Sequence, residues 1–130
     1  MRVLKYCLDT HPLIWYFTGQ KTLSPKIKSI LDDVFLKAVP CLIPTIVLLE
    51  SFHLSLKHDK FYFPAFLKEL RIPNLTIVPL DKIVLSYCYR LPKNLNIHDR
   101  VVAATTMATK STLITKDQLL RNTLGLKTTW

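Results

Sequence analysis

Short runs of apolar, β-branched and aromatic residues recur along the chain and are separated by longer segments with helical periodicity. This pattern predicts a buried strand at residues 2–8, further strands at 41–43, 74–78 and 112–115, and an edge strand within the closing residues 126–130. Each of the first four runs is short and largely apolar. Strands of this kind are typical of a parallel sheet that is covered on both faces.

The segments between these strands carry helix start signals. Thr10 is expected to cap a helix that runs from about residue 12 to Gly19, because a hydroxyl followed by proline suits a first turn. Thr45 is likewise expected to cap a long apolar helix. Further helices are expected after the cap Ser24, over 63–70, 80–90 and 97–109, and after Asp117.

The alternating order of strands and helices predicts the fold class. We expect an α/β protein, a three-layer α/β/α sandwich with a central, mostly parallel sheet. The 130 residues contain two glycines, no internal repeat and no low-complexity segment, so a single domain is expected over residues 1–130.

Charge and cysteine content indicate which kinds of partner the protein binds and in which cellular compartment it works. The formal net charge of +9 favours a polyanion, nucleic acid first, with an acidic protein or a membrane surface as alternatives. The three cysteines are odd in number, widely spaced and set in apolar sequence, which favours reduced core thiols over a disulfide or a zinc site. No apolar run is long enough for a signal peptide or a membrane span. A cytoplasmic protein without a membrane partner is therefore expected.

The acidic residues divide into two groups. Five of the nine lie beside lysines, in turns or at helix ends, and are expected on the surface: Asp32, Asp33, Asp59, Glu69 and Asp81. The other four lie against apolar sequence: Asp9, Glu50, Asp99 and Asp117.

The expected topology brings these four acids together. The carboxyl ends of parallel strands share the edge at which such sheets bind ligands, so Asp9 and Asp117 should converge there, with Asp99 close by. Glu50 would have to reach in from its helix. Two carboxylates about 4 Å apart repel by roughly 4 kcal/mol at an effective dielectric near 20. Lys116 and Arg100 could offset this repulsion, but a divalent cation does so more completely, and oxygen ligands suit Mg²⁺ or Mn²⁺.

Each acid taken singly also has a purely structural interpretation. Asp9 could be a turn residue or place negative charge at a helix N-terminus, Asn96 with Asp99 resembles a capping box, and Asp117 could be a cap. Glu50 has the weakest alternative, because an acid inside an apolar helix needs a partner. His11 and His98 flank the expected site, where either could touch a substrate.

Six stretches of the chain resemble one known family. They are "LDTHPLIW" (8–15), "LSPKIKSIL" (23–31), "IPTIVLLE" (43–50), "HDRVVAATTMA" (98–108), "LITKD" (113–117) and "LKTTW" (126–130). In this order they are similar to the PIN-domain ribonucleases, specifically the VapC-type toxins of bacterial type II toxin–antitoxin systems.

The resemblance implies an α/β/α fold and a Mg²⁺- or Mn²⁺-dependent endoribonuclease that a cognate antitoxin inhibits. It assigns metal binding and catalysis to the four acids already isolated, Asp9, Glu50, Asp99 and Asp117. Thr115 matches a hydroxyl residue that supports the last acid, and Asn96 stands where family members often carry an additional acid. With Thr10 these form the supporting set.

A mechanism and its rivals follow from this resemblance. Metal-assisted hydrolysis of RNA is expected, with Arg100 and Lys116 holding the RNA backbone. A homodimer, or a larger toxin–antitoxin assembly, is implied by the family. The alternative is a catalytically inactive PIN-like module that binds RNA or protein. A phospho-acceptor signalling domain is disfavoured, because it would not explain the basic charge or the acid within a helix.

Overall fold

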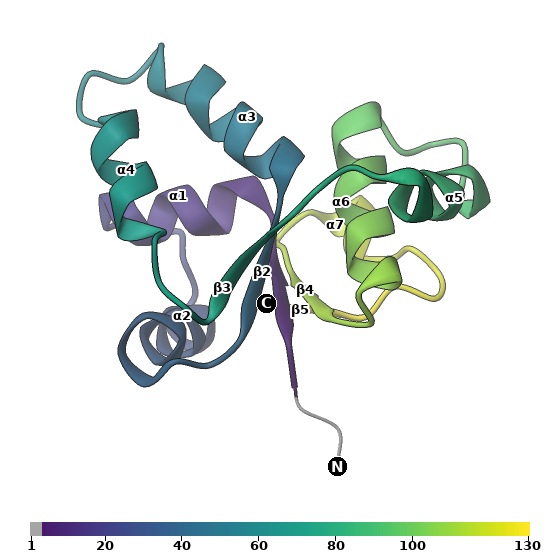
Figure 1. Cartoon of the computed structure of the whole chain (residues 1–130), viewed down its shortest axis with the longest axis horizontal. Coiled ribbons are helices and arrows are strands. Elements are labelled where there is room, and N and C mark those ends of the chain that lie inside the picture. Colours follow the sequence, from purple (N-terminus) through teal and green to yellow (C-terminus); the bar gives the residue numbers. More distant parts are fainter. Residues whose placement is uncertain (1–3) are drawn as a thin grey trace.

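Five parallel strands lie between two groups of helices in the computed structural model, which describes residues 4–130 (Figure 1). The strands are β1 (Tyr6–Leu8), β2 (Cys41–Pro44), β3 (Leu75–Val78), β4 (Thr112–Ile114) and β5 (Thr128–Thr129). The helices are α1 (Thr10–Thr18), α2 (Pro25–Lys37), α3 (Thr45–Ser55), α4 (Phe63–Glu69), α5 (Lys82–Arg90), α6 (Ile97–Ala108) and α7 (Gln118–Arg121).

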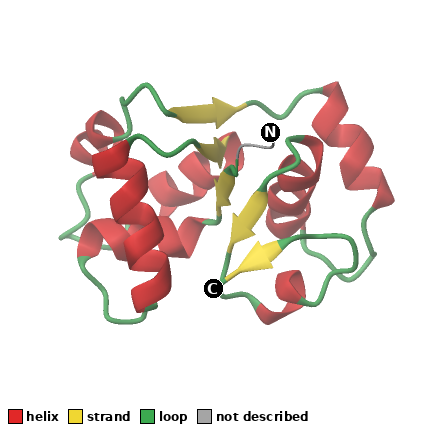
Figure 2. Ribbon diagram, turned by 90° about the horizontal axis from the view of Figure 1, so that it is seen from below, coloured by secondary structure: helices red, strands yellow, loops and turns green. Residues whose placement is uncertain are grey.

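The strand order places β1 at the centre of the sheet. The order is β3-β2-β1-β4-β5, and Tyr6 of β1 pairs with Cys41 on one side and Thr112 on the other. The chain moves outward from β1 to β3 and then returns to place β4 on the far side of β1. Helices α1 to α4 therefore cover one face and α5 to α7 the other, as Figures 1 and 2 show. The carboxyl ends of β1 and β4 flank the point where the strand order reverses, where such sheets bind ligands.

The inner strands are buried, as their sequences predict. Cys7, Ile43, Leu113 and Ile114 have no exposed surface and lie among the side chains of both helical layers. The expected three-layer α/β/α fold is confirmed, and so is the edge strand near the C-terminus. Residues 2 and 3 of the first expected strand lie outside the described residues.

Two expected helix caps are wrong in detail. Asp9, not Thr10, caps α1: its side chain accepts a hydrogen bond from the Thr10 amide, and the helix begins at Thr10 rather than near residue 12. Thr45 begins α3 without capping it, because its hydroxyl donates to the carbonyl of Val78 at the end of β3. The caps expected at Ser24 and Asp117 are confirmed.

The three cysteines lie in the core, as expected from their apolar surroundings in the sequence. Cys7, Cys41 and Cys88 are free and buried. Across residues 4–130 no helix has the length and hydropathy that crossing a bilayer would require.

Candidate active site

A cavity of about 580 Å³ opens at the carboxyl edge of the sheet, beside the crevice between β1 and β4. The residues that line it are Asp9, His11, Pro12, Trp15, Glu50, Asn96, His98, Asp99, Lys116 and Asp117. All four acids isolated from the sequence are among them. They come from the ends of β1 and β4 and from α3 and α6, so contacts between elements distant in the chain assemble this group.

Asp9 is held from both sides. One carboxylate oxygen accepts the Thr10 amide at 2.8 Å, and the other accepts the Thr115 hydroxyl at 2.7 Å. Burial raises the pKa of Asp9, the two hydrogen bonds lower it, and the negative charge of Glu50 raises it further. An ionised carboxylate has about four acceptor positions, so two remain for a cation.

Thr115 links the first acid to the last. Its side chain is buried, and its hydroxyl donates to Asp9 while accepting the Asp117 amide at 3.1 Å. Asp117 in turn caps α7 by accepting the Leu120 amide at 2.9 Å. The expected support of Asp117 by Thr115 therefore acts through the backbone, while the hydroxyl proton goes to Asp9.

Asp99 lies in the first turn of α6, and the negative charges of the other three acids act on its carboxylate. The Asn96 side chain caps this helix by accepting the Asp99 amide at 2.8 Å. Burial, together with the negative charges of Asp117, Asp9 and Glu50, raises the pKa of Asp99 to about 6. Asn96 thus has a structural role as a cap, and the Asp99 carboxylate is left to face the other acids.

Glu50 reaches the cavity from the opposite helical layer. It lies on α3, which contacts α6 across the carboxyl edge of the sheet. Its carboxylate is 3.3 Å from Nδ1 of His98, and 29% of its side chain is exposed. This pairing of Glu50 with the residue next to Asp99 was missed, since nothing in the sequence links positions 50 and 98.

The donor set suits a hard divalent cation in kind and number. Four carboxylates line the cavity without a cysteine, and such oxygen ligands are those that Mg²⁺ and Mn²⁺ prefer. Within residues 4–130, however, no three His, Cys, Asp or Glu side chains are close enough together to hold one ion. Bringing three carboxylates onto one ion requires side-chain rotations that their mutual repulsion opposes and a bound cation favours.

The two basic residues expected to hold RNA have different surroundings. Lys116 lines the cavity, and its ammonium lies 5.9 Å from the centre of the Trp15 ring. Arg100 does not line it. Its guanidinium donates to four carbonyls at the end of α5 and in the loop that follows, those of Cys88, Leu91, Pro92 and Leu95. Four of its five N–H donors are thus used within the protein, which gives Arg100 a structural role, while its contact with RNA stays a prediction.

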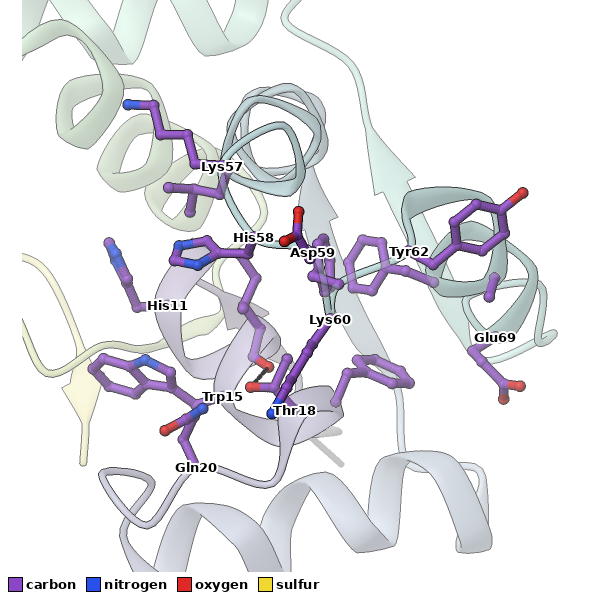
Figure 3. Close-up of a pocket in the computed structure, with 16 residues that line it drawn as sticks. His11, Trp15, Thr18, Gln20, Lys57, His58, Asp59, Lys60, Tyr62 and Glu69 are labelled. Carbon is purple, nitrogen blue, oxygen red and sulfur yellow. Dashed lines mark hydrogen bonds between the residues drawn. The ribbon is translucent and has the colours of Figure 1, made fainter.

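A larger cavity of about 950 Å³ adjoins the first and was not expected from the sequence (Figure 3). It lies between α1 and the loop that joins α3 to α4, and His11 and Trp15 line both cavities. The loop reads "LKHDKFY" (56–62), in which basic residues are followed by two aromatic ones. Such a mixture of basic and aromatic residues is typical of surfaces that bind single-stranded nucleic acid, and it is the sequence feature from which this cavity could have been predicted.

Comparison with known proteins gives one family and a set of similar folds. The sequence profile of the PIN domain matches residues 6–124. No curated protein matches the sequence significantly.

Three solved structures illustrate the structural likeness. One is VapBC2 from Rickettsia felis bound to a DNA fragment from their promoter, with a TM-score of 0.73, 18% identity, and coverage of 97% of this chain and 98% of that one. VapBC-1 from nontypeable Haemophilus influenzae gives a TM-score of 0.67, 15% identity and 97% coverage of each chain. A toxin–antitoxin complex from Klebsiella pneumoniae gives a TM-score of 0.61, 20% identity and 86% coverage of each chain. At these identities the likeness establishes the fold.

Proposed function

We propose that this chain, which belongs to the PIN domain family, is a metal-dependent endoribonuclease and acts as the toxin of a toxin–antitoxin pair. One observation carries the proposal: Asp9, Glu50, Asp99 and Asp117, from four separate elements, line one cavity at the point where the strand order reverses. Uncompensated carboxylates repel one another, so a protein that gathers four of them has a use for cations there.

Mg²⁺ or Mn²⁺ is the proposed cofactor. Asp9, Asp99 and Asp117 would be the principal ligands, and Glu50 would be either a further ligand or the group that orients the attacking water. When bound, the ion lowers the pKa of a coordinated water and stabilises the negative charge of the phosphodiester transition state. The remaining acceptor positions of Asp9 and the two hydrogen bonds that fix its carboxylate support this assignment.

The surrounding residues orient the reacting groups. Glu50 would accept a proton from water at the cavity, and its contact with His98 supports this role because it restricts the direction of the carboxylate. Lys116, exposed at the rim, would contact an RNA phosphate. Thr115 and Asn96 hold the backbone from which Asp117 and Asp99 project.

Replacement of one acid tests the proposal. In Mg²⁺ or Mn²⁺, the unaltered protein should cleave single-stranded RNA, and Asp9→Asn should lose at least 100-fold in rate because a neutral amide is a poor ligand for a hard cation. Asp33→Asn is the matched control, since Asp33 pairs with Lys37 on the surface of α2. Full cleavage by Asp9→Asn would refute the metal-ligand role of Asp9.

The alternative is a PIN-like module that binds RNA or protein without cleaving. The lack of three closely grouped ligand side chains within residues 4–130 is the one observation that favours it. Calorimetric titration of Mn²⁺ separates the two, because the enzyme should bind the ion and Asp117→Asn should bind it much more weakly. Absence of Mn²⁺ binding by the unaltered protein would favour the non-catalytic module.

The partner proposed is a cognate antitoxin, together with a second copy of the chain. The neighbours VapBC2 and VapBC-1, and the Klebsiella pneumoniae toxin–antitoxin complex, support the antitoxin. Exposed apolar residues on α3 and at its C-cap, namely Leu49, Phe52 and Leu56, offer a surface for a homodimer or a larger assembly. We further propose a single domain in the cytoplasm, where the free cysteines would stay reduced.

A further inference from the structure

Trp15 stands at the junction of the two cavities. It and His11, one turn apart on α1, line both the cavity of the four acids and the larger cavity beside it. Figure 3 shows His11, Trp15 and His58 at one end of the larger cavity, with Gln20 next to Trp15. A molecule that enters the larger cavity at this end therefore meets the indole within reach of the acids.

The indole is held in place by its neighbours while remaining partly exposed. Its ring centre is 5.5 Å from that of His11 and 6.0 Å from that of Trp130, which packs at a steep angle of 71°. The ammonium of Lys116, on an exposed side chain, lies 5.9 Å from the ring centre. Such an ammonium can move to a phosphate when one is present, which leaves the ring available.

We propose that Trp15 stacks against one unpaired base of the RNA, and that the phosphate next to this base lies among the four acids. The inference rests on the proposed nuclease function and adds the recognition of the substrate. Every base has a face that stacks on an aromatic ring, so such contacts select single-stranded over double-stranded nucleic acid with little sequence preference. His11, His58 and Gln20 supply hydrogen-bonding groups for the edge of the base.

The distribution of charge favours RNA over an acidic protein segment at this end. The larger cavity as a whole is lined by two lysines and two acids, Lys57, Lys60, Asp59 and Glu69. Figure 3 places Glu69 at the far end with Tyr62, away from His11 and Trp15. The ammonium of Lys116 lies beside Trp15 and borders the proposed position of the phosphate. A base stacked on the Trp15 indole, with its phosphate at the Lys116 ammonium, would contact both side chains.

Tryptophan fluorescence tests the contact directly. The chain contains two tryptophans, so Trp130→Phe leaves Trp15 as the single emitting indole. In Mn²⁺ buffer, in the interval after rapid mixing and before cleavage, a single-stranded 12-nucleotide RNA should quench this emission. A double-stranded RNA of the same length and an oligomer that carries abasic riboses should not. Equal quenching by all three probes, or none by the single strand, would overturn the proposal.

Cleavage kinetics provide the second measurement. Trp15→Ala should raise KM for single-stranded RNA roughly 10-fold or more, as expected for the loss of one stacked base, and Trp15→Phe should retain part of the affinity. Trp15→Ala should weaken the cleavage of RNA more than the cleavage of an oligomer that carries abasic riboses, because the abasic oligomer offers no base to the indole. An unchanged KM in Trp15→Ala would overturn the stacking role and leave this end of the cavity to another occupant, such as a protein segment.

The two proposals fail in different ways. Quenching by single-stranded RNA without cleavage of either substrate would refute the nuclease and retain the stacking contact. Cleavage without quenching would retain the nuclease and refute the contact.

Discussion

The hydroxyl of Thr115 connects Asp9 to the backbone of Asp117, so its removal tests directly how these two acids are positioned. Thr115→Val keeps the branched shape but deletes the donor to Asp9 and the acceptor for the Asp117 amide. Because Thr115 is buried, no bulk water replaces the hydroxyl at that point. The substitution therefore leaves one oxygen of the Asp9 carboxylate without its hydrogen bond.

The magnitude follows from these two bonds. A hydrogen bond to a charged group contributes about 1.5–3 kcal/mol, and one to a backbone amide about 1 kcal/mol. The added methyl returns about 0.8 kcal/mol through its burial. We therefore expect Thr115→Val to lower the free energy of unfolding by about 2–3 kcal/mol at neutral pH. We also expect it to reduce Mn²⁺ affinity or RNA cleavage about 10- to 100-fold, as is usual when a partner of a metal ligand is removed.

Urea unfolding at pH 7 and calorimetric Mn²⁺ titration measure the two effects. Thr105→Val is the matched control, because Thr105 is equally buried but its hydroxyl donates only to the Val101 carbonyl within its own helix. That variant should change the free energy of unfolding by less than about 1 kcal/mol and leave Mn²⁺ binding intact. If Thr115→Val were no less stable than Thr105→Val and bound Mn²⁺ normally, the account of Asp9 as a carboxylate fixed by Thr115 would be refuted.

Three further predictions concern charge at and around the cavity. Because the pKa of Asp99 is raised to about 6, the folded protein keeps a proton there that the unfolded chain has lost. The free energy of unfolding in metal-free buffer should therefore fall as the pH rises from about 4 to about 6, and urea titrations across this range should show a smaller fall in Asp99→Asn. Arg100→Lys should lower the free energy of unfolding by about 2 kcal/mol, since a lysine cannot reach four carbonyls at once, and an unchanged urea midpoint would contradict this. Lys116→Gln should leave stability within about 0.5 kcal/mol but reduce the salt dependence of RNA binding by about one ion, measured by fluorescence anisotropy at several salt concentrations.

Local sequence was sufficient for the elements and for the choice of acids. The apolar runs at β1, β2 and β4 predicted buried parallel strands, and Ser24 followed by Pro25 predicted the start of α2, because these signals depend on residues within one turn or one strand. The same reasoning isolated four acids next to apolar sequence, and the topology implied by the strands predicted a common edge. The predicted cap of α1 was wrong by one residue: Asp9, which follows β1, caps the helix, and Thr10 is its first residue.

Tertiary structure decided which partners the charged groups at and near the cavity of the four acids have. Arg100 lies beside Asp99 in sequence, yet it bonds to carbonyls near the end of α5, and Glu50 meets His98 only because α3 and α6 cross the edge of the sheet from opposite layers. The junction cavity at Trp15 likewise needs α1 and the loop after α3 to lie side by side. Hydropathy and capping act over a few residues, and a sequence reports them directly. Electrostatic pairing and cavity shape depend on distances in space between segments far apart in the chain, which the packing of the two helical layers on the sheet sets.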